Sequence, residues 1–455
     1  MDIVQEIKSD EPMASGCPLR QSQDVRELVP PKRGFIVEYA TDPLRQYVED
    51  LPRQIRDLNT RVAEPIAPTT STTHGAKTLA DFAALKEREA TGTLRPDEAE
   101  YFRYGTPITR RLEARLAALE GGEASVVFRS GMAAISSVID SVLPLTGEVG
   151  HIIVGTEGYR QTRNILERMV KRKQVELTVI PMDGFTEVYK HLKPNTVAVF
   201  YESISNPYLR VIDVQDVKAQ IVAAGSKALN IVDHTFASPI NQKPLELGAD
   251  IVVPSLTKYM SGNNQVGAGA VIGRADLVAR VKEVRGQVGN IAHDIDCLGV
   301  EVGLETLNER VERANANGVH VANLLTRNPN VLEVWYPGHP THTDYKTAQA
   351  QMSGFGGVIS FRIRARDFHD IAAFTDAFIA ASSTGTYIAP SFGGDQPLLS
   401  VVAIVSHFSQ TPAERAARGI PDDLLRLSVG TGSPQNLTEA FQRGFSALEA
   451  RMGCI

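Results

Sequence analysis

A lysine follows a short apolar run in the middle of the chain, in the stretch DIVVPSLTKYMSGNN (residues 250–264). The run Ile251–Val253 has the composition of a buried strand, and Ser255, Thr257 and Lys258 come after it. A lysine at a strand end is usually solvated, and this stretch alone favours that interpretation. A lysine held beside apolar residues could instead be a catalytic amine, because burial lowers its pKa. That second interpretation requires partner residues elsewhere in the chain.

Polar residues follow other apolar runs in the same way. Ligands of an open parallel sheet bind at the carboxyl ends of its strands, so these positions are the candidates for a site. They are Ser130, Gly131 and Met132 after SVVF; Glu202, Ser205 and Asn206 after TVAVFY; and Asp233, His234 and Thr235 after ALNIV. The Ser-Gly turn suits a phosphate, although an ordinary serine N-cap explains it equally well. One such turn, one Asn, one Asp and one Lys form the set that pyridoxal 5′-phosphate (PLP) requires from a protein.

The chain divides into three parts by composition. Residues 1–106 are polar and contain many prolines, with one helix expected in TLADFAALKEREATG and ending near Gly92. Residues 107–303 alternate short apolar runs with helical stretches, which predicts a large α/β domain with a mostly parallel sheet. Residues 304–455 mix helices with strands such as GGVISFRI and LLRLSVG, which predicts a smaller α+β domain.

Three other features have simple structural interpretations. GAGAVIG fails the spacing of a dinucleotide-binding loop, because Ile272 occupies its last position, so we expect a closely packed strand. HPTHTDY is interpreted as a loop, and no metal site is expected. The basic residues between Arg160 and Lys173 are expected to form a solvated helix face.

Composition limits the classes of function. The chain has 455 residues, of which 43% are apolar, and a formal net charge of −6, so no general attraction to nucleic acid or anionic membranes is expected. Cys17, Cys297 and Cys454 are scattered and odd in number, which suggests a reducing compartment. No signal peptide or membrane-spanning run is apparent, so a cytoplasmic location is expected.

The motifs resemble those of the PLP-dependent cysteine and methionine metabolism (trans-sulfuration) enzymes. This family includes cystathionine γ-synthases, γ-lyases and O-acylhomoserine sulfhydrylases. The resemblance extends from about Tyr101 to Gly430 and implies a PLP-dependent transferase fold of the aspartate-aminotransferase type. It is carried by YFRYGTPITRRLEARLAALEGG, SGMAAI, GYRQTR, ESISNPYLRVID, VDHTFASPINQKPLELGADIVVPSLTKY, QMSGFGGVISF, YIAPSFGG and LLRLSVG. GYRQTR, NPYLRVID and YIAPSFGG are closest to the plant-type cystathionine γ-synthase branch.

The resemblance also implies the roles of individual residues. Lys258 would attach PLP and move protons, Asp233 would pair with the pyridine nitrogen, and Tyr159 would stack on the ring and assist proton transfer. The cofactor phosphate would be held by Gly131, Met132, Ser255 and Thr257. The substrate carboxylate would be held by Asn206 and Arg426, with Ser391 close by, because a guanidinium suits a bidentate clamp.

Assembly follows from the same resemblance. Tyr101 and Arg103 correspond to the family's Tyr-x-Arg pair, which reaches the phosphate of a neighbouring subunit. Residues 1–106 are therefore expected to form an extension and arm that contacts that subunit. The expected active unit is at least a homodimer, with a homotetramer as the family arrangement.

The sequence departs from the family around the expected substrate mouth. Gly262-Asn263-Asn264-Gln265 replaces the family's Gly-His-Asn-Asp or Gly-His-Ser-Asp, and Asp395-Gln396-Pro397 replaces the Cys-Glu-Ser of the plant-type branch. The expected PLP-binding residues are intact. These departures therefore put the substrate in question more than the chemistry.

The expected activity is γ-replacement on an O-activated homoserine-type amino acid, as in a cystathionine γ-synthase. The alternatives are γ-elimination, a specialised γ-replacement with a nucleophile other than cysteine in secondary metabolism, and a catalytically inactive relative. Intact Lys258, Asp233 and Arg426 argue against the inactive relative.

Overall fold

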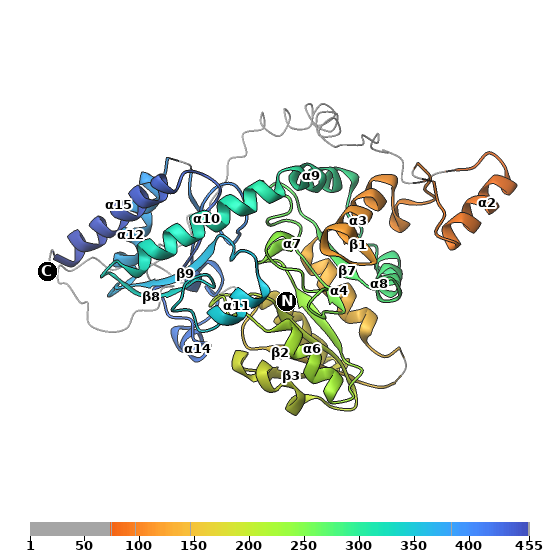
Figure 1. The fold of residues 1–455 in the computed structure, drawn as a ribbon, viewed down its shortest axis with the longest axis horizontal. Helices are drawn as coiled ribbons and strands as arrows, with labels where there is room; N and C mark the ends of the chain where they lie inside the picture. Colours follow the sequence, from red (N-terminus) through yellow and green to blue (C-terminus); the bar gives the residue numbers. More distant parts are fainter. Residues whose placement is uncertain (1–72, 74, 96, 146, 384, 454–455) are drawn as a thin grey trace, which may run out of the picture.

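A computed structural model describes residues 73, 75–95, 97–145, 147–383 and 385–453. Most of the N-terminal extension, including Cys17, lies outside the described residues, and so does Cys454. The helix expected in TLADFAALKEREATG is present as α2 (Leu79–Ala90), and the Thr78 side chain caps its start by accepting a hydrogen bond from the Asp81 N–H. In Figure 1, α2 lies at one end of the molecule, away from both sheets.

A seven-stranded sheet forms the centre of the larger part of the molecule. In spatial order its strands are β1 (Ala124–Phe128), β7 (Gly269–Gly273), β6 (Ile251–Val252), β5 (Leu229–Asp233), β4 (Thr196–Glu202), β2 (Gly150–Gly155) and β3 (Val175–Ile180). Strands β6, β5, β4, β2 and β3 pair in parallel, whereas β7 is antiparallel to both of its neighbours. The prediction of a mostly parallel α/β sheet is therefore confirmed, with an antiparallel pair at one edge.

Helices connect and cover these strands (Figure 1). They are α3 (Pro107–Glu120), α4 (Gly131–Val142), α5 (Arg160–Lys171), η3 (Met182–His191), α6 (Val214–Ala223), α7 (Ser238–Asn241), α8 (Ala275–Val288) and α9 (Asp294–Glu305). The strands read as continuous apolar runs because both faces of the sheet are buried, and two separate clusters of apolar side chains pack against it. The close packing expected of GAGAVIG is present in β7, where a Cβ on Gly269 would lie 2.5 Å from the Ser130 carbonyl oxygen.

A second, five-stranded sheet forms the smaller part of the molecule. Its strands in spatial order are β10 (Tyr387–Ile388), β11 (Leu398–Val401), β12 (Leu424–Ser428), β9 (Val358–Ile363) and β8 (Val331–Trp335). Its helices are α10 (Leu307–Thr326), α11 (Tyr345–Gln351), α12 (Phe368–Ala381), α13 (Val402–Val405), α14 (Pro412–Ala417) and α15 (Pro434–Gly453). Stacked and edge-on rings of Phe374, Phe378, Phe441 and Phe445 join α12 to α15. This sheet has its own apolar core. A further apolar cluster, formed by α10, β9 and the loops that follow β4, β5 and β6, packs the two parts against each other.

Candidate functional site

The site is built where strands β4, β5 and β6 end. The register of β4 and β5 places Glu202 directly opposite Asp233, and β6 leads into the loop that carries Ser255, Thr257 and Lys258. Thr235 links these segments, because its hydroxyl donates to Asp233 Oδ1 at 2.5 Å and accepts from the Ser255 N–H at 2.9 Å. The parallel strands therefore deliver the predicted carboxylate and the predicted amine to the same edge of the sheet.

Lys258 is not a solvated strand-end lysine. Its Nζ donates to Ser391 Oγ at 2.8 Å and lies 5.3 Å from the centre of the Phe392 ring. Burial, with a further contribution from the nearby Arg426 charge, lowers the pKa of Lys258 to about 8. An appreciable fraction of this amine is therefore neutral and nucleophilic near neutral pH.

Asp233 is buried at the end of β5, with 6% of its surface exposed. Burial raises the pKa of this carboxyl to about 6, although hydrogen bonds from the Thr235 hydroxyl and backbone N–H act in the opposite direction. A buried carboxylate without a cation is unfavourable, so the site favours a positively charged partner at this position.

A cradle forms where α4 begins. Ser130 caps this 12-residue helix by accepting from the Ala133 N–H, and Gly131 is its first residue. A Cβ on Gly131 would lie 3.0 Å from Ser255 Cβ and 3.1 Å from Ser255 Oγ, so a side chain here would press on Ser255. The partial positive charge and free N–H groups of a helix N-terminus suit a phosphate.

The other two predicted phosphate ligands are placed differently. Thr257 Oγ1 donates to the Ala268 carbonyl at 3.2 Å and accepts from the Ala268 N–H at 3.1 Å, which ties the lysine loop to the segment before β7. The Met132 side chain packs against the apolar core beneath α4, so a role for this residue in phosphate binding would use its backbone N–H.

Asn206 and Arg426 meet although they are far apart in the sequence. One guanidinium nitrogen of Arg426 donates to Asn206 Oδ1 at 2.8 Å. Arg426 is 8% exposed and lies over Phe392 and Phe236, 5.7 and 5.9 Å from the ring centres. Burial lowers the pKa of this guanidinium to about 10, and the neighbouring Glu202 partly offsets the effect. The group remains a cation at neutral pH and is held in a nearly dry setting that suits a carboxylate.

Tyr159 is joined to this region through its backbone. It precedes α5, 47% of its surface is exposed, and its backbone N–H donates to the Glu202 carboxyl. Exposure of an aromatic ring at the edge of a buried polar site leaves its face available for stacking.

Tyr101 and Arg103 lie on the short 3₁₀ helix η2 (Phe102–Tyr104) and its flank. Arg103 donates to the Gly286 carbonyl at 2.7 Å and lies over the rings of Tyr101 and Tyr104. Within the described residues, these contacts join η2 to α8 and not to Lys258 or Asp233. The structure of one chain thus brings together the other predicted residues but leaves this pair apart from them.

Two aromatic residues of the site were not predicted. Phe236 and Phe392 stack with ring centres 4.1 Å apart, and Phe392 faces both Lys258 and Arg426. Both lie inside the quoted motifs, three residues after Asp233 and directly after Ser391. That proximity was a usable signal, but an apolar ring in a motif is more often assigned to the core.

The residues present fit PLP. An amine with a lowered pKa, a buried carboxylate at the same edge of the sheet and a helix start at a glycine are the three attachments that the cofactor requires. Among the described residues, no group of three or more His, Cys, Asp or Glu side chains could hold a metal ion. His342, in the loop HPTHTDY, is buried and accepts from the Asp344 N–H.

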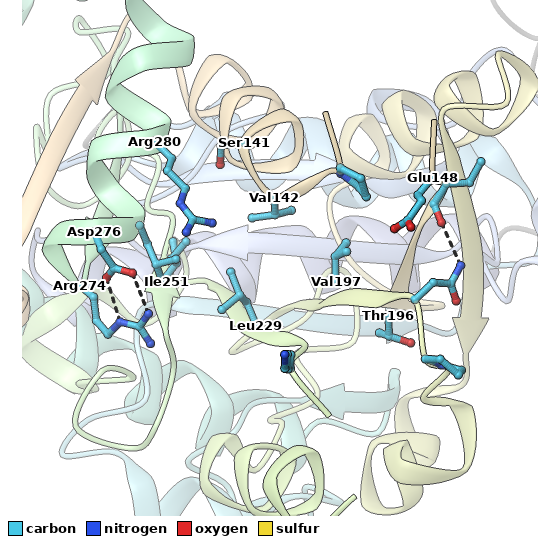
Figure 2. A pocket seen from close by; sticks show the side chains of 16 residues that line it. Ser141, Val142, Glu148, Thr196, Val197, Leu229, Ile251, Arg274, Asp276 and Arg280 are labelled. Atoms are coloured by element: carbon cyan, nitrogen blue, oxygen red, sulfur yellow. Dashed lines mark hydrogen bonds and ion pairs between the residues drawn. The ribbon is translucent and has the colours of Figure 1, made fainter. Parts of the chain in front are cut away.

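A separate hollow of about 390 Å³ lies at the opposite edge of the large sheet, where β4, β5 and β6 begin (Figure 2). Figure 2 shows Val142, Val197 and Leu229 along its floor and Arg274 paired with Asp276 at one side. None of the predicted site residues lines it. The predicted site residues and this hollow are therefore at opposite ends of the same strands.

Comparison with known proteins agrees with this geometry. Residues 53–446 match the family described as Cys/Met metabolism PLP-dependent enzyme. The chain is 37% identical over 332 residues to the chloroplastic cystathionine gamma-synthase 1 of Arabidopsis thaliana, covering 73% of this chain and 57% of that protein. It is 35% identical over 347 residues to a cystathionine beta-lyase of Lactococcus lactis, covering 76% of this chain and 88% of the lyase.

A solved structure shares the fold. The cystathionine gamma synthase of Xanthomonas oryzae pv. oryzae, determined in complex with cystathionine, superposes with a TM-score of 0.74 at 29% identity, covering 87% of this chain and 97% of that one. The chain spans 57% of the length of the Arabidopsis relative, so the shared fold does not by itself assign the activity of that whole protein to this chain. The shared fold, the family match over most of the chain and the fitting residues have one explanation: this chain is a member of the Cys/Met metabolism family of PLP-dependent enzymes.

Proposed function

We propose that the enzyme catalyses γ-replacement on an O-activated homoserine-type amino acid, in the manner of a cystathionine γ-synthase. The observation that supports this best is the placement of two basic groups around Phe392, the half-buried Lys258 amine and the buried Arg426 guanidinium. One can move protons and the other can hold a carboxylate, and they belong to one continuous cluster. The 37% identity to a plant cystathionine gamma-synthase supports the replacement branch.

PLP supplies an electron-withdrawing ring over which negative charge at the substrate Cα is delocalised. Lys258 would attach the cofactor and, once released, would take the Cα proton and return protons to the substrate carbons. Asp233 would hold the pyridine nitrogen in its protonated form. The Gly131 end of α4, with Ser255 and Thr257, would hold the phosphate, and Tyr159 would cover the ring.

Arg426 and Asn206 would fix the substrate through its α-carboxylate. Ser391 accepts from Lys258 in the structure and would orient the amine toward the substrate. In the overall exchange, the Cγ–O bond breaks with its electron pair leaving on the acyl or phosphoryl oxygen, and a thiolate sulfur forms the new Cγ–S bond. The thiol proton leaves with the acid, so protons balance without an oxidant or a reductant.

γ-Elimination is the second candidate. A Fusobacterium nucleatum relative named as an L-methionine gamma-lyase is 34% identical to this chain over 350 residues, close to the 37% of the synthase. Without a bound nucleophile, the same substrate would lose its γ-substituent and hydrolyse to a 2-oxo acid and ammonia. A nucleophile other than cysteine stays open because of the departures at Asn263, Gln265, Asp395 and Gln396.

The test is a product screen. Purified enzyme is incubated with O-acetyl-, O-succinyl- and O-phosphohomoserine, with and without cysteine or other thiols, and the products are identified by mass spectrometry. We expect a thioether amino acid when a thiol is present and only slow 2-oxo acid formation without it. Lys258→Ala is the control for uncatalysed reaction. Rapid 2-oxo acid formation that no thiol diverts would assign a lyase, and no turnover by a PLP-loaded protein would favour the inactive relative.

Attachment of the cofactor is tested separately. Borohydride reduction of the yellow holoenzyme followed by peptide mapping should place the adduct on Lys258. An adduct on another lysine would exclude the proposed site.

We also propose a homo-oligomer, at least dimeric, in which Tyr101 and Arg103 serve the neighbouring subunit's site. The cytoplasmic location expected from the sequence stays a proposal, because the similar plant protein is named as chloroplastic. None of the helices in the described residues combines the length and hydropathy needed to cross a bilayer.

A further inference from the structure

A second buried carboxyl lies beside Asp233. Glu202 ends β4, is 7% exposed and faces Asp233 across the parallel pair. Its Oε1 accepts from the Tyr159 N–H, whereas its Oε2 is buried and has no hydrogen-bond partner among the described residues. Buried polar atoms are nearly always paired, with protein or with water, so this oxygen requires a partner.

A small cavity lies next to Glu202. Its volume is about 40 Å³, and it is lined by the end of β2, the turn before α5, the first turns of α5 and the end of β4. Thr162 also lines it, is 8% exposed, and its hydroxyl is likewise buried without a partner among the described residues. A water needs roughly 10–15 Å³ and two or more polar partners, so the cavity has both the room and the groups to hold ordered water.

Burial and two neighbouring carboxyls oppose the ionisation of Glu202, and the nearby cations offset them only in part. Asp233 faces it from β5 and Glu157 from the turn after β2, while Arg426 faces it from β12 and Arg163 lines the cavity from α5. Burial and the neighbouring Asp233 raise the pKa of Glu202 well above its usual range, and the Tyr159 N–H and Arg426 offset this only in part. Arg163 is paired with Glu167 at 2.9 Å, which reduces its effect on the cavity.

A neutral Glu202 would have two consequences at the site. It would leave Asp233 as the only anion facing the pyridine nitrogen, and it would not compete with substrate for the Arg426 guanidinium. It would also keep its bond to the turn on which Tyr159 stands. Gly158 fits this turn because it adopts a positive φ of 140° directly over the Glu202 carboxyl, where a Cβ would lie 3.5 Å from Oε1.

We propose that Glu202 is a positioning residue that carries a proton and, together with Thr162, binds water in this cavity. It thereby fixes the Tyr159 turn without placing a second negative charge beside Asp233. The inference rests on the proposed function only through the roles of Tyr159 and Asp233.

Infrared spectroscopy of the holoenzyme tests the proton directly. Spectra are recorded in H₂O and D₂O at about pH 8. Burial raises the pKa of Asp233 to about 6, so at this pH Asp233 is ionised and adds no protonated-carboxyl band. When the spectrum of Glu202→Gln is subtracted from that of the wild type, the C=O stretching band of a protonated carboxyl should remain, and this band should shift in D₂O. Glu176→Gln is the matched control, because Glu176 is exposed on β3 and paired with Lys193, so no such band should be lost. If Glu202→Gln removes no protonated-carboxyl band, the proposal is wrong.

Thr162→Val tests the water. This change keeps the shape of the side chain and removes its hydroxyl, so the Glu202 C=O band should move to higher frequency as the water is lost. An unmoved band would show that Glu202 and Thr162 share no water. Both spectroscopic results are independent of turnover, so they stand apart from any failure of the proposed reaction.

Kinetics separate positioning from mere stability. Glu202→Gln imitates the protonated form and should keep kcat within about threefold of the wild type, whereas Glu202→Ala should lower kcat roughly tenfold with little change in KM, because the Tyr159 turn is released. The rates are normalised to PLP content, and the melting temperature of each variant is measured to show that both are folded at the assay temperature. A Glu202→Gln enzyme as impaired as Glu202→Ala would mean that the ionised form is required and would overturn the proposal.

Discussion

Lys258 and Arg426 show how burial and neighbouring charge act on single residues. Both basic groups lie over the ring of Phe392, and each has a lowered pKa, chiefly because of burial. For the lysine, a lower pKa supplies a neutral amine. For the arginine, whose usual pKa is much higher, the charge stays in place, and burial reduces the water that a substrate carboxylate bound there would have to displace.

Arg426→Lys should separate substrate binding from cofactor binding. A lysine keeps the charge but loses the planar pair of donors, so we expect KM for the amino acid to rise about tenfold or more, with PLP content unchanged. Steady-state kinetics with the cofactor quantified by absorbance measures both quantities. Arg364→Lys, at an exposed arginine after β9, is the control and should have no effect. Loss of PLP in Arg426→Lys would instead place this residue in the cofactor site.

Asp233→Asn should stabilise the apoprotein and weaken PLP binding. Burial raises the pKa of Asp233 from 3.8 to about 6, so the folded state binds its proton more tightly than the unfolded state does. The stability contribution of this group is therefore fully present below pH 3.8 and is lost as the pH rises through about 6.

At pH 7.5 the ionised carboxylate should cost about 3 kcal/mol, an order-of-magnitude value from the shift of about two units. Urea unfolding of the apoproteins should show Asp233→Asn to be the more stable above about pH 6, with the difference disappearing near pH 4. PLP affinity should fall in the same variant, since an amide cannot hold the protonated pyridine as a carboxylate does. Equal stabilities at all pH values would contradict the shifted carboxyl.

At the scale of elements, the proposed phosphate cradle depends on the contact between the start of α4 and the lysine loop. Gly131 fits there because of this close approach, since a Cβ would lie 3.0 Å from Ser255 Cβ. The strand ends that deliver Asp233 and Lys258 are fixed by parallel pairing, whereas this contact is fixed by how tightly one helix packs over the loop.

Gly131→Ala should therefore weaken PLP binding without unfolding the protein. We expect the dissociation constant for PLP, measured by fluorescence titration of the apoenzyme, to rise by roughly tenfold, because the methyl group must push Ser255 aside by a few tenths of an ångström. Gly453→Ala, where an added Cβ would meet nothing within 4 Å, is the matched control. Unchanged affinity in Gly131→Ala would mean that the phosphate is held elsewhere.

At the scale of the whole molecule, the position of Arg103 bears on assembly. In one chain its guanidinium is occupied by Gly286 and by two tyrosine rings. The adjoining Arg285 is fully buried and pairs with Glu113 at 2.6 Å, so η2 rests on a rigid support formed by α8 and α3. A rigid support of this kind can present Tyr101 and Arg103 to a second subunit.

Subunit mixing should reveal a shared site. Arg103→Ala and Lys258→Ala proteins should each be nearly inactive, and refolding them together should restore at most roughly a quarter of wild-type activity, since one site in each hybrid dimer is then intact. A mixture of Asp233→Asn and Lys258→Ala is the control, because both changes damage the site of the chain that carries them. No recovery with verified hybrids would place Arg103 in its own chain's site or outside any site.

Much of this architecture could be read from the sequence because buried parallel strands are local apolar runs. The strands ending near Asp233 and Lys258, the helix beginning at Gly131 and the family itself were predicted from such runs and motifs, and the structure and comparisons confirm the fold and the family. Periodicity reports burial but not pairing partners, so it did not indicate that β1 and β7 pair in antiparallel fashion.

Only the tertiary structure decided how distant residues meet. Ser391 is 133 residues from the lysine that it binds, and Asn206 is 220 residues from Arg426, so their contacts depend on packing between the two sheets. The same holds for pKa values, because desolvation exists only once the fold has closed around Lys258, Asp233 and Glu202. The sequence by itself determined which groups were available for the chemistry. The assembled fold determined their distances, their charges and the water that reaches them.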